Sequence, residues 1–285
     1  MDNWRLEVLE ALDERKVKGV IKQSCFRNPM RFRQGTVNHQ DFLFSMKESQ
    51  DEYYIAAYNL VRNLLTGLAK RSKVFCSQKY GFVDYPFTYR ERQLDSILLP
   101  ELSQLCKGLV FAEYPITRNS RKKGYEADDS KGRIDYWCIY KDYSFSIEVK
   151  HSYQNLNSNK TKDETMHRWD VMNNYQHISS RKDLRNFIER TKGIICLSVH
   201  FVTIESGKEP DDALLADYKN NEQAILVRLY DDLKSIAEPD FMASWKIDGN
   251  MVKQLPFEGF SYPGLILASK FYKPINHKGS KEYEK

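Results

Sequence analysis

The chain has 285 residues, of which 41% are hydrophobic and 29% are charged, a balance typical of a globular protein with a substantial core. Its formal charge of +5 is mildly basic, which is compatible with a polyanionic partner but does not indicate one. The five cysteines form no CxxC pair, so we expect neither a zinc site nor a disulfide framework, and we expect a cytoplasmic location. The N-terminus lacks the apolar core of a signal peptide, and no apolar run approaches the roughly 20 residues that span a membrane.

Residues 1–80 are expected to be mostly helical. Within them, "DEYYIAAYNLVRNLLTGLAK" (51–70) carries apolar residues at three- and four-residue spacing, which predicts an amphipathic helix. We therefore predict an N-terminal helical region, residues 1–80, that docks DNA or a partner subunit, or supports a homodimer. The remaining residues, 81–285, are predicted to form a second domain.

From residue 81 onward, helix patterns alternate with strand patterns. We predict helices over 89–106, 163–178, 181–191 and 211–237, and strands over 108–116, 133–140, 143–150, 193–203 and 263–272. Pro100 lies inside the first of these helices and is expected to kink or break it. The order of the elements predicts an α/β fold in which helices flank a mixed sheet.

Two of the strands, 133–140 and 143–150, are separated only by Lys141 and Asp142, which predicts a two-residue hairpin. That register places Asp135 directly opposite Glu148. Because side chains alternate along a strand, Lys150 shares their face, whereas apolar residues occupy the other face.

Two interpretations of the charged face stay open. Carboxylates about 5 Å apart repel by roughly 3 kcal/mol at an effective dielectric near 20, and a divalent cation with a preference for oxygen ligands offsets that repulsion. Alternatively, Arg133 and Lys150 neutralise Asp135 and Glu148 as four exposed ion-paired residues. In either case His151 points away from this face.

Several other chemistries are excluded. The six histidines form no HxxxH pair, which argues against a histidine-bound metal hydrolase. The chain contains neither a GxSxG motif nor a phosphate-binding loop of the Walker type, so serine hydrolases and nucleotide-driven motors do not fit.

Asp135, followed after twelve residues by Glu148-Val149-Lys150, resembles the motif of the PD-(D/E)XK nuclease superfamily, and "GRID" (132–135) is similar to the motif of its RecB-like members. The resemblance covers about residues 85–205, and 206–285 are additions to that core. It implies a restriction-endonuclease-like fold, with a core of helix, three strands, helix and strand. It also implies Mg²⁺-dependent hydrolysis of phosphodiester bonds, with Mn²⁺ as a substitute. Asp135 and Glu148 are then metal ligands, and Lys150 is a catalytic residue that stabilises charge or orients water.

Many members of the superfamily add an acidic residue from the helix before the first strand. Glu91 is the first choice for this further catalytic residue and metal ligand, because it lies at the start of the predicted helix. Asp95 lies one turn further on the same face, Glu101 follows Pro100, and Glu113 lies in the first strand.

The chain departs from the superfamily pattern in two places. Ile134 replaces a proline, and the Gln-x-x-x-Tyr helix motif of the RecB-like members is missing after Lys150. We therefore expect a DNA endonuclease of the restriction or phage-defence kind. A catalytically inactive subunit that binds nucleic acid or forms a complex, and a nuclease directed at RNA, are the alternatives.

Basic residues gather in two predicted loops beside the motif, 118–132 and 151–162. Phosphate contacts are their expected role, although charge in exposed loops also serves solubility. The candidate nucleic-acid-binding residues are Arg118, Arg121, Lys122, Lys123, Lys131, Arg133, Lys160 and Lys162.

Overall fold

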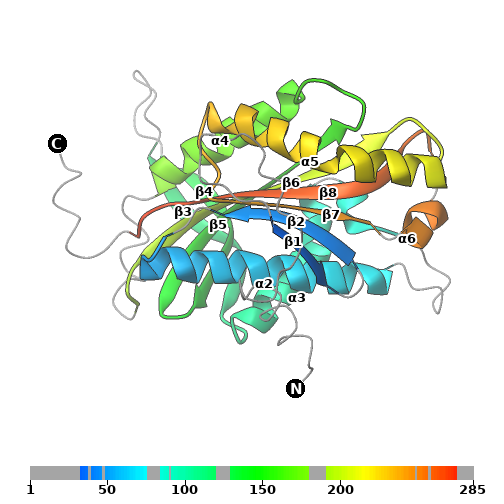
Figure 1. The fold of residues 1–285 in the computed structure, drawn as a ribbon. Helices are drawn as coiled ribbons and strands as arrows, with labels where there is room; N and C mark the ends of the chain where they lie inside the picture. Colours follow the sequence, from blue (N-terminus) through cyan, green and yellow to red (C-terminus); the bar gives the residue numbers. More distant parts are fainter. Residues whose placement is uncertain are drawn as a thin grey trace.

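The computed structural model describes residues 33–37, 40–46, 49–75, 84–89, 91–119, 129–179, 191–247, 249–255 and 258–274. They form an α/β fold in which helices cover both faces of one mixed sheet, as the sequence predicted (Figure 1). The strands are β1 (Arg33–Val37), β2 (Gln40–Met46), β3 (Val110–Asn119), β4 (Asp129–Tyr140), β5 (Tyr143–Asn155), β6 (Ile194–Ser206), β7 (Phe241–Lys246) and β8 (Ser261–Phe271). The helices are α2 (Glu52–Phe75), α3 (Asp95–Leu105), α4 (Asp163–Ser179), α5 (Asp212–Lys234) and α6 (Gly249–Gln254), with 3₁₀ turns η2 (Pro86–Thr88) and η3 (Glu91–Leu94) before α3.

Among the described residues, eight strands join in the order β1-β2-β7-β8-β6-β5-β4-β3. Strands β5 and β6 run parallel, whereas the other neighbouring pairs are antiparallel. Parallel neighbours need a long crossover connection, and the chain between β5 and β6 contains α4. The succession α3, β3, β4, β5, α4 and β6 has the order predicted for residues 85–205.

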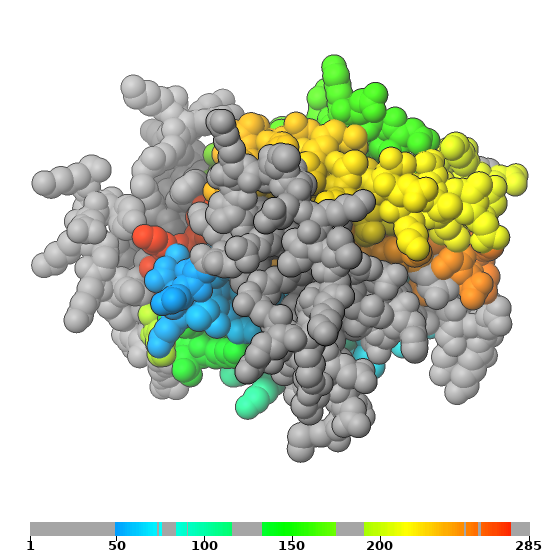
Figure 2. Space-filling view, viewed as in Figure 1, coloured from blue at the N-terminus to red at the C-terminus, as the bar shows by residue number. Residues whose placement is uncertain are grey.

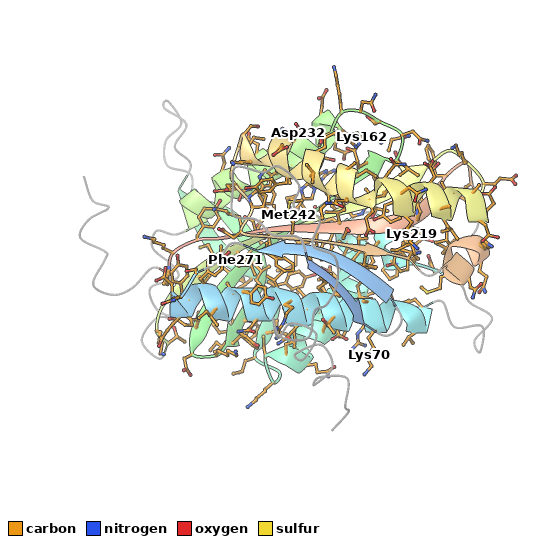
Figure 3. The ribbon with its side chains drawn as sticks, viewed as in Figure 1. Lys70, Lys162, Lys219, Asp232, Met242 and Phe271 are labelled. Carbon is orange, nitrogen blue, oxygen red and sulfur yellow. The ribbon has the colours of Figure 1, made fainter. Side chains whose placement is uncertain are left out.

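The sheet separates two apolar cores, because alternate side chains of each strand point to opposite faces. Helices α2 and α3 cover one face and helices α4 and α5 the other (Figure 1). Met242 points toward the α5 side and Phe271 toward the α2 side (Figure 3). In the space-filling view, α2 and α5 lie at the surface on either side of the sheet (Figure 2).

Helix α2 confirms the helix predicted from apolar spacing and extends it to Phe75. Its apolar stripe is almost completely buried in the core that it shares with α3 and the sheet. The residues of this stripe are Ala57, Leu60, Val61, Leu64 and Leu68. In the described part of the chain, no helix is long and apolar enough to cross a bilayer.

Gly67 allows α2 and α3 to approach closely. A Cβ atom at Gly67 would collide with the carboxylate of Glu101. That carboxylate instead accepts a hydrogen bond of 2.6 Å from Nε of Arg71, and Glu101 is buried. Because this ion pair lies between the two helices, Glu101 serves their packing.

The hairpin of β4 and β5 has the predicted register. Tyr140 pairs with Tyr143 and Tyr136 with Ile147, which confirms the two-residue turn. Lys141 and Asp142 have φ angles of 45° and 65°, the left-handed backbone that a type I′ turn requires at both positions. This conformation is unfavourable for residues that have a Cβ atom, so the turn stores strain.

The N-terminal expectation is wrong for residues 33–37 and 40–46, which form β1 and β2 rather than helix. Strand β2 pairs with β7, and α2 contributes to the same core as β4 to β8. The expected division at residue 80 therefore does not coincide with a break in the sheet or in the core. Residues 1–32 lie outside the described residues, as does the helix predicted over 181–191, apart from residue 191.

Four further elements differ from the prediction. Helix α3 continues through Pro100 to Leu105, so the proline does not break it. Strand β5 runs to Asn155 and includes the first part of the predicted loop 151–162. Strand β7 and helix α6 were not predicted, because residues 241–254 are too short for a clear period in either pattern.

Replacing Lys141 and Asp142 together by Asn-Gly is expected to raise the free energy of unfolding by about 1 kcal/mol, because these residues adopt the left-handed backbone at lower cost. Urea unfolding measures the change. The double alanine variant retains the strain and is the control, with no expected gain. An unchanged midpoint for Asn-Gly would contradict the assignment of strain to this turn.

Candidate active site

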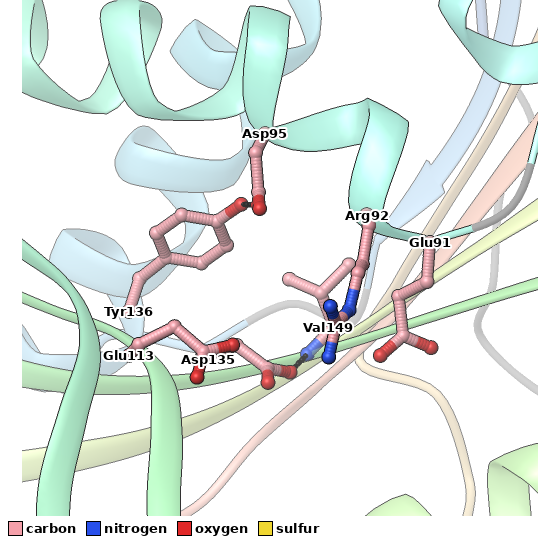
Figure 4. A pocket seen from close by; sticks show the side chains of 7 residues that line it. All are labelled: Glu91, Arg92, Asp95, Glu113, Asp135, Tyr136 and Val149. Atoms are coloured by element: carbon pink, nitrogen blue, oxygen red, sulfur yellow. Dashed lines mark hydrogen bonds between the residues drawn. The ribbon is translucent and has the colours of Figure 1, made fainter.

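Asp135 lies where the backbone pairing of β4 is interrupted on both sides. Tyr136 and Ile134 pair with β3 but Asp135 between them does not, and pairing with β5 ends at Tyr136. The backbone N–H of Val149 donates instead to Oδ2 of Asp135, at 2.7 Å (Figure 4). This bond fixes one carboxylate oxygen at the opening between the strands.

The expected direct pairing of Asp135 with Glu148 is not formed, because the ladder ends one residue earlier at Tyr136 and Ile147. The two carboxylates are instead linked by Lys150, whose Nζ lies 3.8 Å from Asp135 Oδ2 and 3.5 Å from Glu148 Oε1.

Glu91 completes this group from η3. Lys150 Nζ donates to Glu91 Oε1 at 3.0 Å, so one ammonium group lies within 4 Å of three carboxylates. Arg168 of α4 lies 3.8 Å from the other oxygen of Glu91 and extends the network. We call Glu91, Asp135, Glu148 and Lys150 the carboxylate–lysine cluster; the structure brings these four predicted residues together.

The carboxylate–lysine cluster is largely withdrawn from water. The exposed fraction of the side chain is 9% for Glu148, 16% for Lys150, 25% for Asp135 and 32% for Glu91. Charges in such surroundings interact more strongly than surface charges do. Three carboxylates therefore leave an excess of negative charge that Lys150 and the more distant Arg168 offset only in part.

The pKa values of two members reflect these surroundings. Burial raises the pKa of Asp135 above its usual range, and the neighbouring Glu91 and Glu113 add to this, against the opposing effects of Lys150 and of the Val149 N–H. Burial alone would lower the pKa of Lys150, but its carboxylate neighbours outweigh that effect and raise it. Lys150 is therefore held in its charged form.

The other acidic candidates make different contacts. Asp95 accepts a short hydrogen bond from the hydroxyl of Tyr136 (Figure 4), and Glu113 pairs with Arg133 at 2.6 Å. Both still line the pocket that contains Glu91 and Asp135. Among the four acids considered for the additional position, Glu91 is the one with a contact to Lys150 in the described structure, whereas Glu101 lies between α2 and α3.

This arrangement is not a preformed cage of protein ligands. Within the described ranges, no group of three or more His, Cys, Asp or Glu residues has the geometry of a metal-binding cluster. The ammonium group of Lys150 lies between the carboxylates instead, and it supplies the positive charge that they need. The alternative of a fully exposed group of four ion-paired residues does not describe this site, since Arg133 pairs with Glu113.

The predicted nucleic-acid-binding residues are only partly described. Arg118 and Lys131 belong to strands β3 and β4, so these strands extend into the predicted loop, whereas Arg121, Lys122 and Lys123 lie outside the described residues. Arg133 and Lys160 are exposed, and Lys162 forms a close ion pair with Glu205. The described basic side chains thus include two exposed ones and one that is already ion-paired.

Sequence reasoning missed a polar group buried behind Lys150. His200 of β6 is the register partner of Lys150; its Nε2 lies 2.9 Å from the hydroxyl of Ser152, and its ring stacks on Trp169 with centroids 6.2 Å apart. Burial lowers the pKa of His200 to about 3. A histidine inside the hydrophobic run 193–203 was the available signal, because fully buried strands rarely carry one.

His151 faces the α2 side, as predicted, and is buried there. Its Nε2 lies 3.2 Å from the carbonyl oxygen of Phe87 and 2.9 Å from the hydroxyl of Thr203. Burial lowers its pKa to about 4. This histidine therefore holds η2 against the sheet, close to η3 in the chain, rather than joining the carboxylate–lysine cluster.

Comparison with protein-family models, with curated proteins and with solved structures gave no match for this chain. The site is therefore interpreted from its own geometry.

The two buried histidines predict acid sensitivity. Both are neutral in the folded protein and take up a proton near pH 6.5 when unfolded, so stability is complete above that pH and falls as the pH drops toward 4 for His151 and 3 for His200. The slope is up to about 1.4 kcal/mol per pH unit for each histidine.

Urea unfolding between about pH 6.5 and pH 4 measures this slope. His200→Gln should reduce it by about 1 kcal/mol per pH unit, because the buried imidazole that must be neutral in the folded protein is removed. Equal slopes in the wild type and in His200→Gln would show that His200 does not titrate as described.

Proposed function

We propose that this chain is a Mg²⁺-dependent endonuclease that hydrolyses phosphodiester bonds in DNA. The observation that carries the proposal is the position of Lys150 Nζ within 4 Å of three carboxylates from three separate elements. Structural ion pairs need one partner each, whereas a site for phosphate chemistry needs clustered acids beside a fixed cation. The order of α3, β3, β4, β5, α4 and β6 supports a restriction-endonuclease-like core, as the motif implied.

The donor set fits Mg²⁺. Hard oxygen ligands are what this ion prefers, and it commonly binds through one or two carboxylates while keeping several waters. Asp135 and Glu148, with Glu91 as a third donor, would hold the ion, and their excess negative charge favours a divalent cation over further protonation. Mg²⁺ at such a site supplies polarisation of a phosphate oxygen and acidification of a bound water.

Lys150 has the properties of a charge-stabilising residue. Its pKa is raised, so it remains protonated at neutral pH, and its hydrogen bonds to Glu91 and to the Val149 carbonyl fix the direction of its ammonium group. A fixed cation is most effective where negative charge develops on the phosphate oxygens during hydrolysis. Lys150 also lies close enough to the carboxylates to orient a water for attack in line with the leaving oxygen.

The pocket beside the carboxylate–lysine cluster is where a backbone phosphate would enter. Glu91, Asp95 and Glu113 line it together with Asp135, and Arg92 lies at its rim (Figure 4). So many acids repel a bare phosphate, so substrate binding at this pocket should depend on a divalent cation. Exposed Arg133 and Lys160 offer the nearby contacts to the nucleic-acid backbone that do not need the metal.

The first experiment on this function is DNA cleavage by variants of the cluster. Plasmid DNA, single-stranded DNA and RNA are incubated with Mg²⁺ or Mn²⁺, and EDTA is added to parallel samples. Glu148→Gln and Lys150→Met should each reduce the cleavage rate by at least about 100-fold, because each removes charge that the transition state needs.

The matched controls are Glu52→Gln and Lys192→Met, since these residues form an exposed ion pair 2.9 Å long on another part of the surface. Both should cleave at the wild-type rate. Binding without cleavage in either metal would support the alternative of an inactive nucleic-acid-binding subunit. Equal cleavage rates in the wild type and all variants would show that the carboxylate–lysine cluster takes no part in cleavage.

The assignment of Glu91 is tested by metal affinity. Glu91→Gln is expected to weaken Mn²⁺ binding by at least about tenfold in a calorimetric titration, because the variant loses a proposed oxygen ligand and its negative charge from the cluster around Lys150. Asp95→Asn should change the affinity by less than about twofold, since Asp95 is hydrogen-bonded to Tyr136. A larger loss of Mn²⁺ affinity in Asp95→Asn than in Glu91→Gln would make Asp95, rather than Glu91, the additional metal ligand.

A further inference from the structure

A small aromatic cluster lies on β3 and β4 beside the carboxylate–lysine cluster. The ring centroid of Phe111 is 5.7 Å from that of Trp137 and 6.1 Å from that of Tyr114, and Tyr114 is 6.1 Å from Trp137. Phe111 and Trp137 are also direct partners in the β3–β4 pairing. The three rings therefore form one group, which we call the aromatic platform.

A backbone irregularity assembles this platform. Phe111 and Tyr114 are three residues apart, so in a regular strand their side chains would point to opposite faces. Glu113, between them, has a φ angle of 52°, which turns the following residue to the side of Phe111. A non-glycine residue in this conformation costs about 1 kcal/mol or more, so the arrangement of the rings is maintained against strain.

Core packing does not account for the exposed ring of the platform. Among the described residues, Trp137 is buried but belongs to neither of the two cores, and Phe111, which packs against it, is 56% exposed. Among the described strands, β3 is the last of the sheet on this side, and Phe111 is exposed to solvent at that edge. A solvent-facing ring supported by two further rings is a surface suited to stacking.

The aromatic platform lies close to the carboxylate–lysine cluster, because Trp137 and Asp135 are on the same strand. Asp135 precedes Trp137 by two residues on β4, so the two side chains lie on the same face about 7 Å apart. Exposed Arg133 precedes Asp135 by two residues, again on the same face. Along β4, an aromatic ring, a carboxylate and a guanidinium group thus follow one another over a length that a nucleotide and its neighbour can span.

We propose that Phe111, supported by Trp137 and Tyr114, stacks an unpaired base next to the phosphate that is cleaved, so that the substrate is single-stranded or frayed DNA. This inference rests on the proposed nuclease function for the position of that phosphate. A base in a duplex has its faces covered by neighbouring pairs, whereas an unpaired base can transfer one face to an aromatic ring. Arg133 is placed to contact the backbone of the same strand.

Binding measurements in Mg²⁺, with each substitution made in the cleavage-deficient Lys150→Met protein, test the platform independently of cleavage. The probes are a short single-stranded DNA that carries 2-aminopurine, the same sequence as a duplex, and the RNA equivalent. Phe111→Ala should weaken binding of the single strand roughly tenfold and abolish the quenching of 2-aminopurine, with less than twofold effect on the duplex. Phe111→Tyr should restore both properties, whereas Phe111→Leu, which is apolar but not aromatic, should not.

The matched control is Phe260→Ala, because Phe260 is also exposed, at 45%, but precedes β8, which is separated from β4 by β6 and β5. It should bind every probe like the wild type. Thermal unfolding of each variant establishes that the exposed substitutions leave the fold intact. Preference for the RNA probe with the same dependence on Phe111 would overturn DNA as the source of the base.

The outcomes separate this inference from the proposed function. Metal-dependent cleavage by a Phe111→Ala protein with unchanged single-strand affinity overturns the platform and leaves the nuclease intact. If stacking depends on Phe111 but the wild-type protein cleaves no nucleic acid in either metal, the platform is supported and the proposed nuclease function is wrong. A change in self-association in Phe111→Ala, without a change in DNA binding, makes the surface a contact between copies of the chain and overturns the inference.

Discussion

The repulsion among three partly buried carboxylates is the constraint on which the site depends. Glu91, Asp135 and Glu148 come from a 3₁₀ turn and two strands, and each is within 4 Å of the same ammonium group. Oxygens that share one ammonium group within 4 Å lie at most about 8 Å from one another, and like charges at that separation repel by roughly 2 kcal/mol at an effective dielectric near 20. Lys150 therefore fixes where η3 can lie relative to the sheet, and η2, which precedes it, is held by His151 from the opposite face.

The strongest sequence predictions concerned features that depend on near neighbours in the chain. The register of the hairpin follows from a turn of two residues, and with it the positions of Asp135 and Lys150 along their strands. The apolar stripe of α2 likewise follows from a local period. The choice of Glu91 depended on its position at the start of a helical segment, and the structure places it against Lys150. The helix and the hairpin needed only local periods and the length of one turn, whereas the choice of Glu91 also used the resemblance to the PD-(D/E)XK superfamily.

What the sequence did not indicate depends on partners far apart in the chain. Strand β2 is stabilised by β7, about 200 residues later, so its own seven residues carry little pattern. The exact contact of Asp135 could not be predicted either, because the ladder ends beside it and a backbone N–H takes the place of a pair. His200 and Arg168 reach the neighbourhood of Lys150 only through the crossover of α4 and β6. Pairing over such separations is set by tertiary packing.

The left-handed residue Glu113 has a further consequence for the behaviour of the protein in concentrated solution. Strand β3 ends the sheet and carries the exposed apolar residues Leu109 and Phe111, a combination that in a flat strand invites another chain to add to the edge. The left-handed backbone at Glu113 departs from the extended conformation that a further strand would need for pairing, and the Glu113–Arg133 ion pair lies beside it. The same irregularity that shapes the surface beside the site therefore disfavours the addition of another strand to this edge.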